Sequence, residues 1–187
     1  MPAIPSLNGE LSDGRVTLRP AAERDIPEIL IAHQDDPELY VLLGMERPPS
    51  GAELGRRMEE APGRIAAGTG VTLTIVEPGS DVCLGEVNSH HIYWDHARAE
   101  LGIWLAPAAR GRGLGLGALR LAATWLFETC GLERLQVLTD PGNEAMLAVA
   151  RAAGFVEEGV LRGYARERGA RVDVVVLSLL AAELAGR

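Results

Sequence analysis

The chain has 187 residues, of which 47% are hydrophobic and 24% charged, a composition that suits one compact globular domain and excludes extensive disorder. Its formal net charge of −8 excludes the chain-wide basic surface of a typical nucleic-acid-binding protein, so we expect no nucleic acid partner. All 18 basic residues are arginine, and the absence of lysine excludes a Schiff-base enzyme and a Walker-A phosphate loop.

The termini and the cysteines indicate where such a protein works. Residues 1–14 lack the basic region and apolar core of a signal peptide, and we expect a loose N-terminal arm there, with residues 15–187 forming a single domain. The most apolar stretch, 174–182, is too short to cross a membrane. Two cysteines are too few for a disulfide scaffold, so we expect a cytoplasmic protein without a membrane partner.

Charge divides unevenly along the chain. The first 96 residues hold 16 acidic and 7 basic residues, whereas the remaining 91 hold 10 acidic and 11 basic residues. A solvated acidic surface is the simpler interpretation. The alternative is that the first half receives a cationic substrate and the second half an anionic one.

The first half of the chain predicts two helices and four strands. Residues 15–19 alternate as in a strand, and Asp25 with Glu28 has capping-box spacing at the start of a helix that ends near residue 33. An irregular stretch over 34–50 precedes a helical segment over about 51–67. Strands are predicted over 71–76, 82–93 and 98–105, and their short links indicate an antiparallel meander.

The second half changes character at a glycine-rich stretch, RGRGLGLG, over residues 110–117. Apolar residues at helical spacing follow it as far as Gly131. A strand over 135–139 then leads to Asn143, which is placed to cap a further helix, and two last strands cover about 154–164 and 171–180. The order of elements predicts an α+β domain around one mixed, mostly antiparallel central sheet that is flanked by helices.

The glycine-rich stretch between a strand and a helix predicts a phosphate-binding turn. The first backbone amides of a helix have no partner inside the helix, and the helix dipole adds positive potential there. Glycine lets a ligand approach the backbone closely, and Arg110 and Arg112 supply charge. A flexible loop is the alternative, but a good helix follows at once.

A dinucleotide-binding fingerprint also matches here. Gly113, Gly115 and Ala118 fit G-x-G-x-x-A, with Glu133 twenty residues after Gly113. However, only 70 residues follow Gly117, and a meander precedes the motif where a Rossmann fold needs a βαβ unit. These two features argue against the function that the match would imply, a nucleotide-linked oxidoreductase.

The sequence resembles the GNAT superfamily of N-acetyltransferases over about residues 15–180. The family signature R/Q-x-x-G-x-G/A corresponds here to Arg110, Gly111, Arg112, Gly113, Leu114 and Gly115. Asn143, followed by Gly154 and Phe155, is a second match, and the segments AELGIWL, GVLRGY and DVVVLSLL resemble the RimJ/RimL-like branch that acts on ribosomal-protein N-termini.

The resemblance implies a GNAT-like fold and direct transfer of an acetyl group from acetyl-CoA to a primary amine, either a protein N-terminus or a small amine. It implies that the amides of the turn hold the pyrophosphate and that Asn143 lies by the pantetheine arm. A backbone N–H near Trp104 to Ala106, which we assign to Leu105, then stabilises the oxyanion. Members of the family are often homodimers, although no stretch here demands a dimer.

Glu100 is the sequence candidate for a general base, because strand alternation places it on one face with Gly102 and Trp104. The branch often has a serine three residues after the asparagine, and here that position is Met146. Tyr164 is the candidate replacement by its chemistry alone. The same departure supports a rival hypothesis, a catalytically silent module that binds acyl-CoA as a sensor or scaffold.

No metal site is expected from the sequence. His90 and His91 are adjacent, with His96, Asp95 and Cys83 nearby along the chain. Neighbouring residues of a regular strand point to opposite faces of the sheet, so this histidine pair would make a poor chelate.

Overall fold

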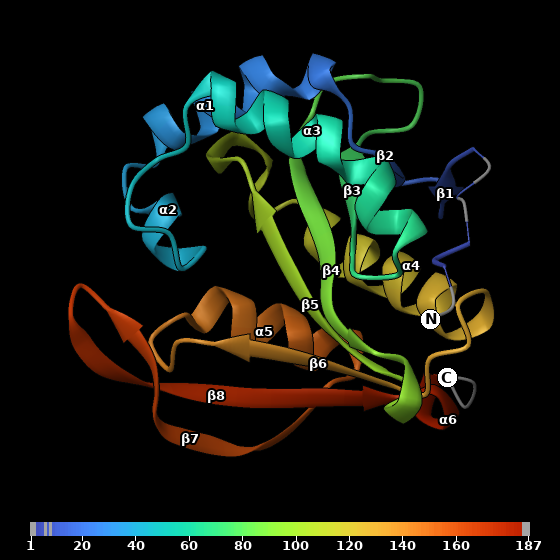
Figure 1. Cartoon of the computed structure of the whole chain (residues 1–187), viewed down its shortest axis with the longest axis vertical. Coiled ribbons are helices and arrows are strands. Elements are labelled where there is room, and N and C mark those ends of the chain that lie inside the picture. The colour runs from blue at the N-terminus through green and yellow to red at the C-terminus, as the bar shows by residue number, and fades with distance from the viewer. Residues whose placement is uncertain (1–2, 6, 8, 185–187) are drawn as a thin grey trace.

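One eight-stranded sheet runs through the molecule (Figure 1). This computed structural model describes residues 3–5, 7 and 9–184. The strand order is β1-β2-β3-β4-β5-β6-β8-β7, and every described pair is antiparallel except β5 with β6. The mixed, mostly antiparallel α+β fold is therefore confirmed. The strands are β1 Leu11–Ser12, β2 Thr17–Pro20, β3 Val71–Val76, β4 Gly85–Tyr93, β5 Arg98–Leu105, β6 Arg134–Thr139, β7 Val156–Glu167 and β8 Ala170–Leu180.

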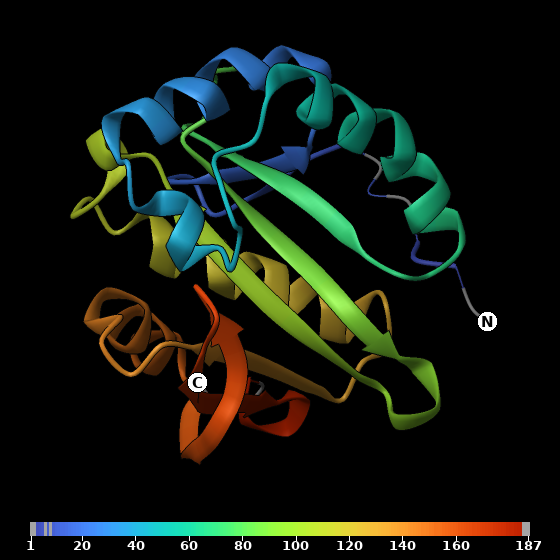
Figure 2. The same ribbon diagram turned by 60° about the vertical axis from the view of Figure 1, so that its left-hand side comes forward.

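Helices cover both faces of the sheet (Figures 1 and 2). They are α1 Ile26–Asp35, α2 Leu39–Leu42, α3 Gly51–Ala66, α4 Leu114–Glu128, α5 Glu144–Ala153 and α6 Ala181–Leu184. The expected meander is present as β3, β4 and β5, whose register pairs Leu73 with Val87 and Val87 with Ile103. Among the residues that the structure describes, no helix is both long and apolar enough to cross a membrane.

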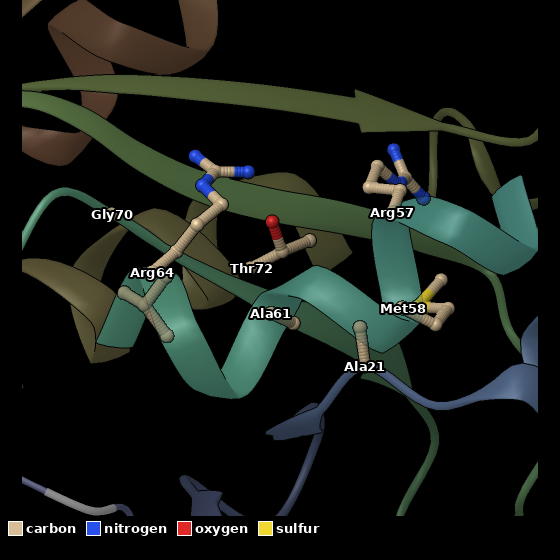
Figure 3. A pocket seen from close by; sticks show the side chains of 8 residues that line it. Ala21, Arg57, Met58, Ala61, Arg64, Gly70 and Thr72 are labelled. Atoms are coloured by element: carbon tan, nitrogen blue, oxygen red, sulfur yellow. The ribbon is translucent and has the colours of Figure 1, made fainter. Parts of the chain in front are cut away.

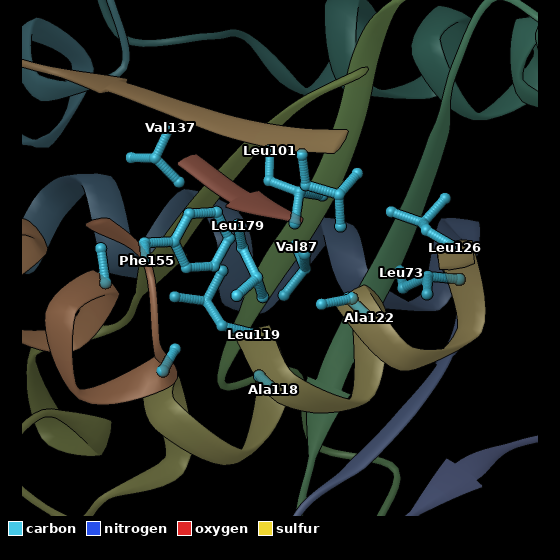
Figure 4. Packing of buried hydrophobic residues seen from close by; sticks show 14 of the residues in the cluster. Leu73, Val87, Leu101, Ala118, Leu119, Ala122, Leu126, Val137, Phe155 and Leu179 are labelled. Carbon is cyan, nitrogen blue, oxygen red and sulfur yellow. The ribbon is translucent and has the colours of Figure 1, made fainter. Parts of the chain in front are cut away.

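Helix α4 forms the main core with one face of the sheet. Its apolar residues recur every three or four positions, so Ala118, Leu119, Ala122 and Leu126 all face the strands (Figure 4). They pack against side chains such as Leu73, Val87 and Leu101 of the meander. Burying one such leucine stabilises the fold by roughly 1.5–3 kcal/mol relative to exposing it.

A second apolar cluster covers the opposite face of the meander. It joins α1, α2 and α3 through Ile29, Leu39 and Leu54, and it includes the side chain of Trp104 from β5. Ser50 caps α3, because its hydroxyl accepts from the Glu53 amide while Glu53 reaches back to the Ser50 amide. The meander therefore separates the two apolar clusters, with α4 on one side and α1 to α3 on the other.

The expected cap at Asp25 is wrong in its partner. Asp25 precedes α1, but its carboxylate makes no side-chain cap to that helix. It is fully buried, where it accepts hydrogen bonds from Arg19, Thr74 and the Ala22 amide. Leaving the buried Arg19 guanidinium without a carboxylate would cost more free energy than leaving the helix end uncapped, so Asp25 pairs with Arg19.

The N-terminal segment is anchored at two places, which differs from a loose arm. Ile4 is buried, and its amide donates to the carbonyl of Ile65 at 3.1 Å. Leu11–Ser12 forms the edge strand β1 beside Leu18 and Thr17 of β2. The apolar side chain of Ile4 gives this segment a place in the core that its glycines and prolines do not reveal.

Strands β5 and β6 diverge soon after they meet. Their parallel pairing covers Arg98–Glu100 and Arg134–Gln136, and no further pair joins them although β5 continues to Leu105 and β6 to Thr139. Beyond this point β6 stays paired with β8. The backbone edges of β5 and β6 are therefore unpaired with each other just before β5 leads into the glycine-rich turn.

Candidate functional site

The glycine-rich stretch forms the turn that starts α4. A short 3₁₀ turn, Pro107–Ala109, ends β5, and the helix begins at Leu114. Gly111 and Gly113 have φ angles of 71° and 78°, in the left-handed region that favours glycine, and Gly113 is the N-cap residue. These two glycines are needed for the shape of the turn.

The other two glycines serve packing. A Cβ on Gly117 would lie 2.6 Å from the Val16 side chain, and a Cβ on Gly115 would point at Leu105 and Val149 at 3.5 Å. Their missing side chains would therefore point into the protein. Gly111 and Gly113 therefore shape the outward side of the turn, whereas Gly115 and Gly117 allow α4 to pack closely against its neighbours.

The turn presents free backbone donors. Within the part of the chain that the structure describes, the amides of residues 111–116 form no hydrogen bond, and the first amide of the series with a partner is Gly117, which donates to Gly113 at 3.4 Å. Several N–H groups at a helix N-terminus attract anionic oxygens, and the helix dipole adds to this attraction. The turn thus fits a pyrophosphate.

Both arginines of the turn are paired with acidic residues. Arg110 donates to Asp36 at 2.5 Å and to the Leu105 carbonyl at 3.1 Å. Arg112 pairs with Glu77 of the β3–β4 turn. All four charged side chains are partly open to solvent, so these pairs are weak and an anionic ligand at the turn would compete with them.

Leu105 and Leu114 contribute their backbones to this place. Leu105 is the last residue of β5, and its carbonyl accepts from Arg110. The Leu114 side chain is buried in the main core, so only its amide faces the turn. Any polar contact of these two leucines with a ligand would therefore come from their backbone groups.

Asn143 caps α5, and α5 lies beside α4. The Asn143 Oδ1 accepts from the Met146 amide at 3.1 Å, as the sequence predicts. Gly115 faces Val149, and Arg120 donates to the Ala152 carbonyl at 2.8 Å, so the two helices run in the same direction. Their N-terminal ends therefore lie on the same side of the sheet.

Glu100 lies at the end of the paired part of β5. His90 of β4 lies opposite it, and Gln136 of β6 donates to its Oε1 at 3.1 Å. Burial raises the pKa of Glu100, but the contacts with His90 and His91 outweigh burial and lower the pKa to about 2. Glu100 is thus an ionised carboxylate where β5 and β6 part.

The expectation that His90 and His91 point to opposite faces is wrong. A β-bulge interrupts β4 after His90, and His91 has a φ of 47°, so the strand loses its regular alternation there. The ring centroids lie 4.8 Å apart, and both rings contact the same carboxylate oxygen of Glu100. The two histidines and Glu100 form a group of possible metal ligands.

Glu86 is a buried carboxylate that the sequence did not single out. It is 1% exposed, it accepts from Arg57 at 2.7 Å and from the indole of Trp104 at 3.0 Å, and burial raises its pKa. A glutamate near the start of a strand is normally exposed, so nothing in the pattern marked it. Its position becomes visible only when α3 is placed over β4 and β5.

A pocket of about 130 Å³ opens above Glu86 and Trp104. It lies between the α1 to α3 region and the meander, on the same face of β5 as Glu100. Its remaining wall residues are Ile29, His33, Leu43, Met45, Pro49, Glu53, Leu54 and Arg57. A neighbouring recess below α3 measures about 10 Å³, with Arg57 and Arg64 on its rim (Figure 3), and it holds at most one water.

Tyr164 is not brought beside Glu100. It lies on β7, which β6 and β8 separate from β5 in the sheet, and it is 55% exposed. The β7–β8 hairpin does reach back towards the first half of the chain (Figure 1), because Arg168 at its tip contacts Glu38 beside α2 at 3.2 Å.

Known proteins resemble this chain in both sequence and fold. Residues 15–156 match the family model described as an acetyltransferase (GNAT) domain. The chain is 30% identical over 171 residues to the "Putative ribosomal N-acetyltransferase YdaF" of Bacillus subtilis strain 168, covering 90% of this chain and 91% of that protein. It is 36% identical over 66 residues to the spermidine N(1)-acetyltransferase of Escherichia coli K12, covering 35% and 36% of the two chains.

A solved structure agrees over nearly the whole length. Mycobacterium smegmatis RimJ in complex with CoA-disulfide superposes with a TM-score of 0.77 at 23% identity, covering 94% of this chain and 88% of that one. The family match spans most of the chain, and the free amides of the turn suit the pyrophosphate of acetyl-CoA, the donor that the family uses. The chain therefore belongs to the GNAT family of acetyltransferases and is an N-acetyltransferase that moves an acetyl group from acetyl-CoA to an amine.

Proposed function

We propose that the acceptor is the α-amine of a protein N-terminus, whose first side chain enters the pocket above Trp104. The observation that carries this proposal is that the pocket carboxylates already have internal partners. Glu86 is paired with Arg57, and Glu53 is paired with Arg47 at 2.6 Å. A polyamine would need free carboxylates, whereas a peptide amine with a small uncharged side chain needs an apolar wall.

The donor side of the proposal rests on the turn and the strand before it. The amides of Gly111, Arg112, Gly113, Leu114 and Gly115 would hold the pyrophosphate, with Arg110 and Arg112 released from their acidic partners. The Leu105 amide would face the acetyl carbonyl, and Asn143 would fix the end of α5 beside the pantetheine arm. When bound, acetyl-CoA supplies a thioester whose acetyl carbon accepts the amine directly.

Glu100 would serve the proton transfer. It lies on the pocket's face of the sheet, and its carboxylate stays ionised because its pKa is about 2. Such a weak base suits a hydrogen bond to the amine, or to a water that carries its proton away, after the C–N bond forms and the C–S bond breaks. Tyr164 is our candidate proton donor to the departing thiolate, on the strength of its chemistry.

A panel of amines tests the acceptor. We expect kcat/KM to be much higher for short peptides with a small uncharged first residue than for spermidine or spermine. We also expect Met45→Trp, which fills the pocket, to raise the KM for the peptide at least tenfold while acetyl-CoA affinity stays the same. Leu42→Trp is the matched control, because Leu42 is exposed and lies outside the pocket wall. Preference for spermidine would overturn the proposal.

A further inference from the structure

A compact group of metal-binding side chains lies at the far end of β4 from Glu86. His90, His91 and Glu100 each present one ligand atom, and these atoms lie within 4.8 Å of one another. The Glu100 Oε2 is 3.0 Å from His91 Nδ1 and 3.5 Å from His90 Nε2.

We propose that His90, His91 and Glu100 form a binding site for one divalent transition-metal ion such as Zn²⁺, and that the bound ion inhibits acetyl transfer by occupying Glu100. The inhibition rests on the proposed role of Glu100, whereas the binding stands on the geometry alone. The two parts therefore fail separately.

The separations suit a small ion. Nitrogen and oxygen ligands lie about 2.1 Å from Zn²⁺, which puts two tetrahedral ligands about 3.4 Å apart. The two distances to Glu100, 3.0 and 3.5 Å, already bracket that value. The remaining separation, between the two histidine nitrogens, is at most 4.8 Å, so a bound ion would require the two imidazoles to rotate towards each other.

Neighbouring residues hold two of the ligands in the orientation that an ion needs. The Asn88 Oδ1 lies 3.0 Å from His90 Nδ1, and Gln136 donates to Glu100 Oε1. If His90 Nδ1 carries its proton towards Asn88, Nε2 directs its lone pair at Glu100 Oε2. A histidine that binds a metal through one ring nitrogen usually donates a hydrogen bond from the N–H of the other to such an oxygen, and this contact orients the ring.

The same orientation explains why a cation is favoured there. A neutral His90 would place a lone pair against an ionised carboxylate, which is repulsive unless a proton or a metal ion lies between them. The imidazole side chains are 37% and 62% exposed and Glu100 is 12% exposed. The group is therefore open to solvent on the histidine side, which leaves room for entry and for a water ligand.

The ligand types select the kind of ion. Two imidazoles and one carboxylate suit Zn²⁺, Co²⁺, Ni²⁺ and similar ions, whereas Mg²⁺ and Ca²⁺ prefer oxygen ligands alone. The β-bulge at His91 is what makes the set possible, because it brings adjacent residues to one side of the strand.

Equilibrium dialysis of the untagged full chain against Zn²⁺, without acetyl-CoA, tests the binding. We expect one ion per chain, no competition from Mg²⁺, and at least a tenfold weaker affinity in His91→Asn. Asparagine tolerates the left-handed conformation of residue 91, so the bulge is retained. His96→Asn is the matched control, because His96 is exposed, close in sequence and outside the group, and it should bind as wild type does.

Wild-type protein that binds no Zn²⁺ at about 0.1 mM would overturn the proposal, and so would equal binding by wild type and His91→Asn. Equal melting temperatures of the metal-free proteins show that the variants are folded. Turnover is then measured with Zn²⁺ and with a chelator. We expect Zn²⁺ to inhibit wild type and the chelator to restore activity. Binding without inhibition would remove only the role of Glu100.

Discussion

At the scale of single residues, Glu100 can be tested with Glu158 as its matched control. Both carboxylates have a pKa lowered to about 2, Glu100 by His90 and His91 against the opposing effect of burial, and Glu158 by Arg134 and Ser178. We expect Glu100→Gln to lower kcat roughly 100-fold, the lower end for proton-transfer groups, with acetyl-CoA affinity unchanged. Glu158→Gln should retain activity. Assays run with a chelator keep metal effects out, and wild-type turnover in Glu100→Gln would contradict the role.

Asp25 is the residue on which stability depends most clearly. Burial raises its pKa, but hydrogen bonds from Arg19, Thr74 and the Ala22 amide outweigh burial and hold the pKa below its usual value. A lowered pKa in the folded state stabilises the protein above the ordinary pKa near 3.9, and this contribution is lost as the pH falls through the folded value. Acid should therefore weaken the wild-type protein partly through this group.

We expect Asp25→Asn to reduce the free energy of unfolding at pH 7 by about 3–5 kcal/mol, because Arg19 then stays buried without its carboxylate. Its unfolding free energy should also depend less on pH between about 2 and 5 than that of wild type. Urea unfolding across this range measures both effects. Asp35→Asn, at an exposed position of α1, is the control and should match wild type.

At the scale of the elements, the cap of α5 is a direct test. We expect Asn143→Ala to cost about 1 kcal/mol of unfolding free energy, because the Met146 amide loses its acceptor. Asn143→Ser keeps an acceptor and should recover most of the loss, and CoA affinity should follow the same order. Urea unfolding and CoA titration check this. Full stability in Asn143→Ala would contradict the cap, and lost affinity in a stable Asn143→Ser would assign a direct contact.

The elements also show what sequence patterns predict and why they stop. The strands over 71–76 and 98–105 and the helix from residue 51 match their predicted ranges closely, because apolar periodicity reports burial directly. The bulge at His91 was not predicted, because the alternation rule for strands assumes a regular backbone. The ion pair between the buried Glu86 and Arg57 was not predicted either, because it depends on how α3 packs over the sheet.

At the scale of the whole molecule, the glycine-rich turn connects two parts of the chain that lie in one sheet. Strands β1 to β5 form one part of the sheet, in which β4 and β5 contribute Glu86 and Trp104 to the pocket, and β6, β8 and β7 join this part through the pairing of β5 with β6. The motif over 110–115 predicted the donor turn from local sequence. The pocket above Trp104, where we propose that the acceptor binds, could not be predicted in this way, because residues from α1, α3, β4 and β5 meet there only after folding.

The short parallel joint between β5 and β6 has a consequence for cooperativity. Three residue pairs connect the two parts of the sheet, and beyond them the strands separate. A donor molecule lying along both strand edges would act as a cross-brace, adding contacts to each part at once. Ligand binding would then do more than add stability, because it would tie the two parts of the sheet together at the place where their strands separate and would raise the free energy of opening one part without the other.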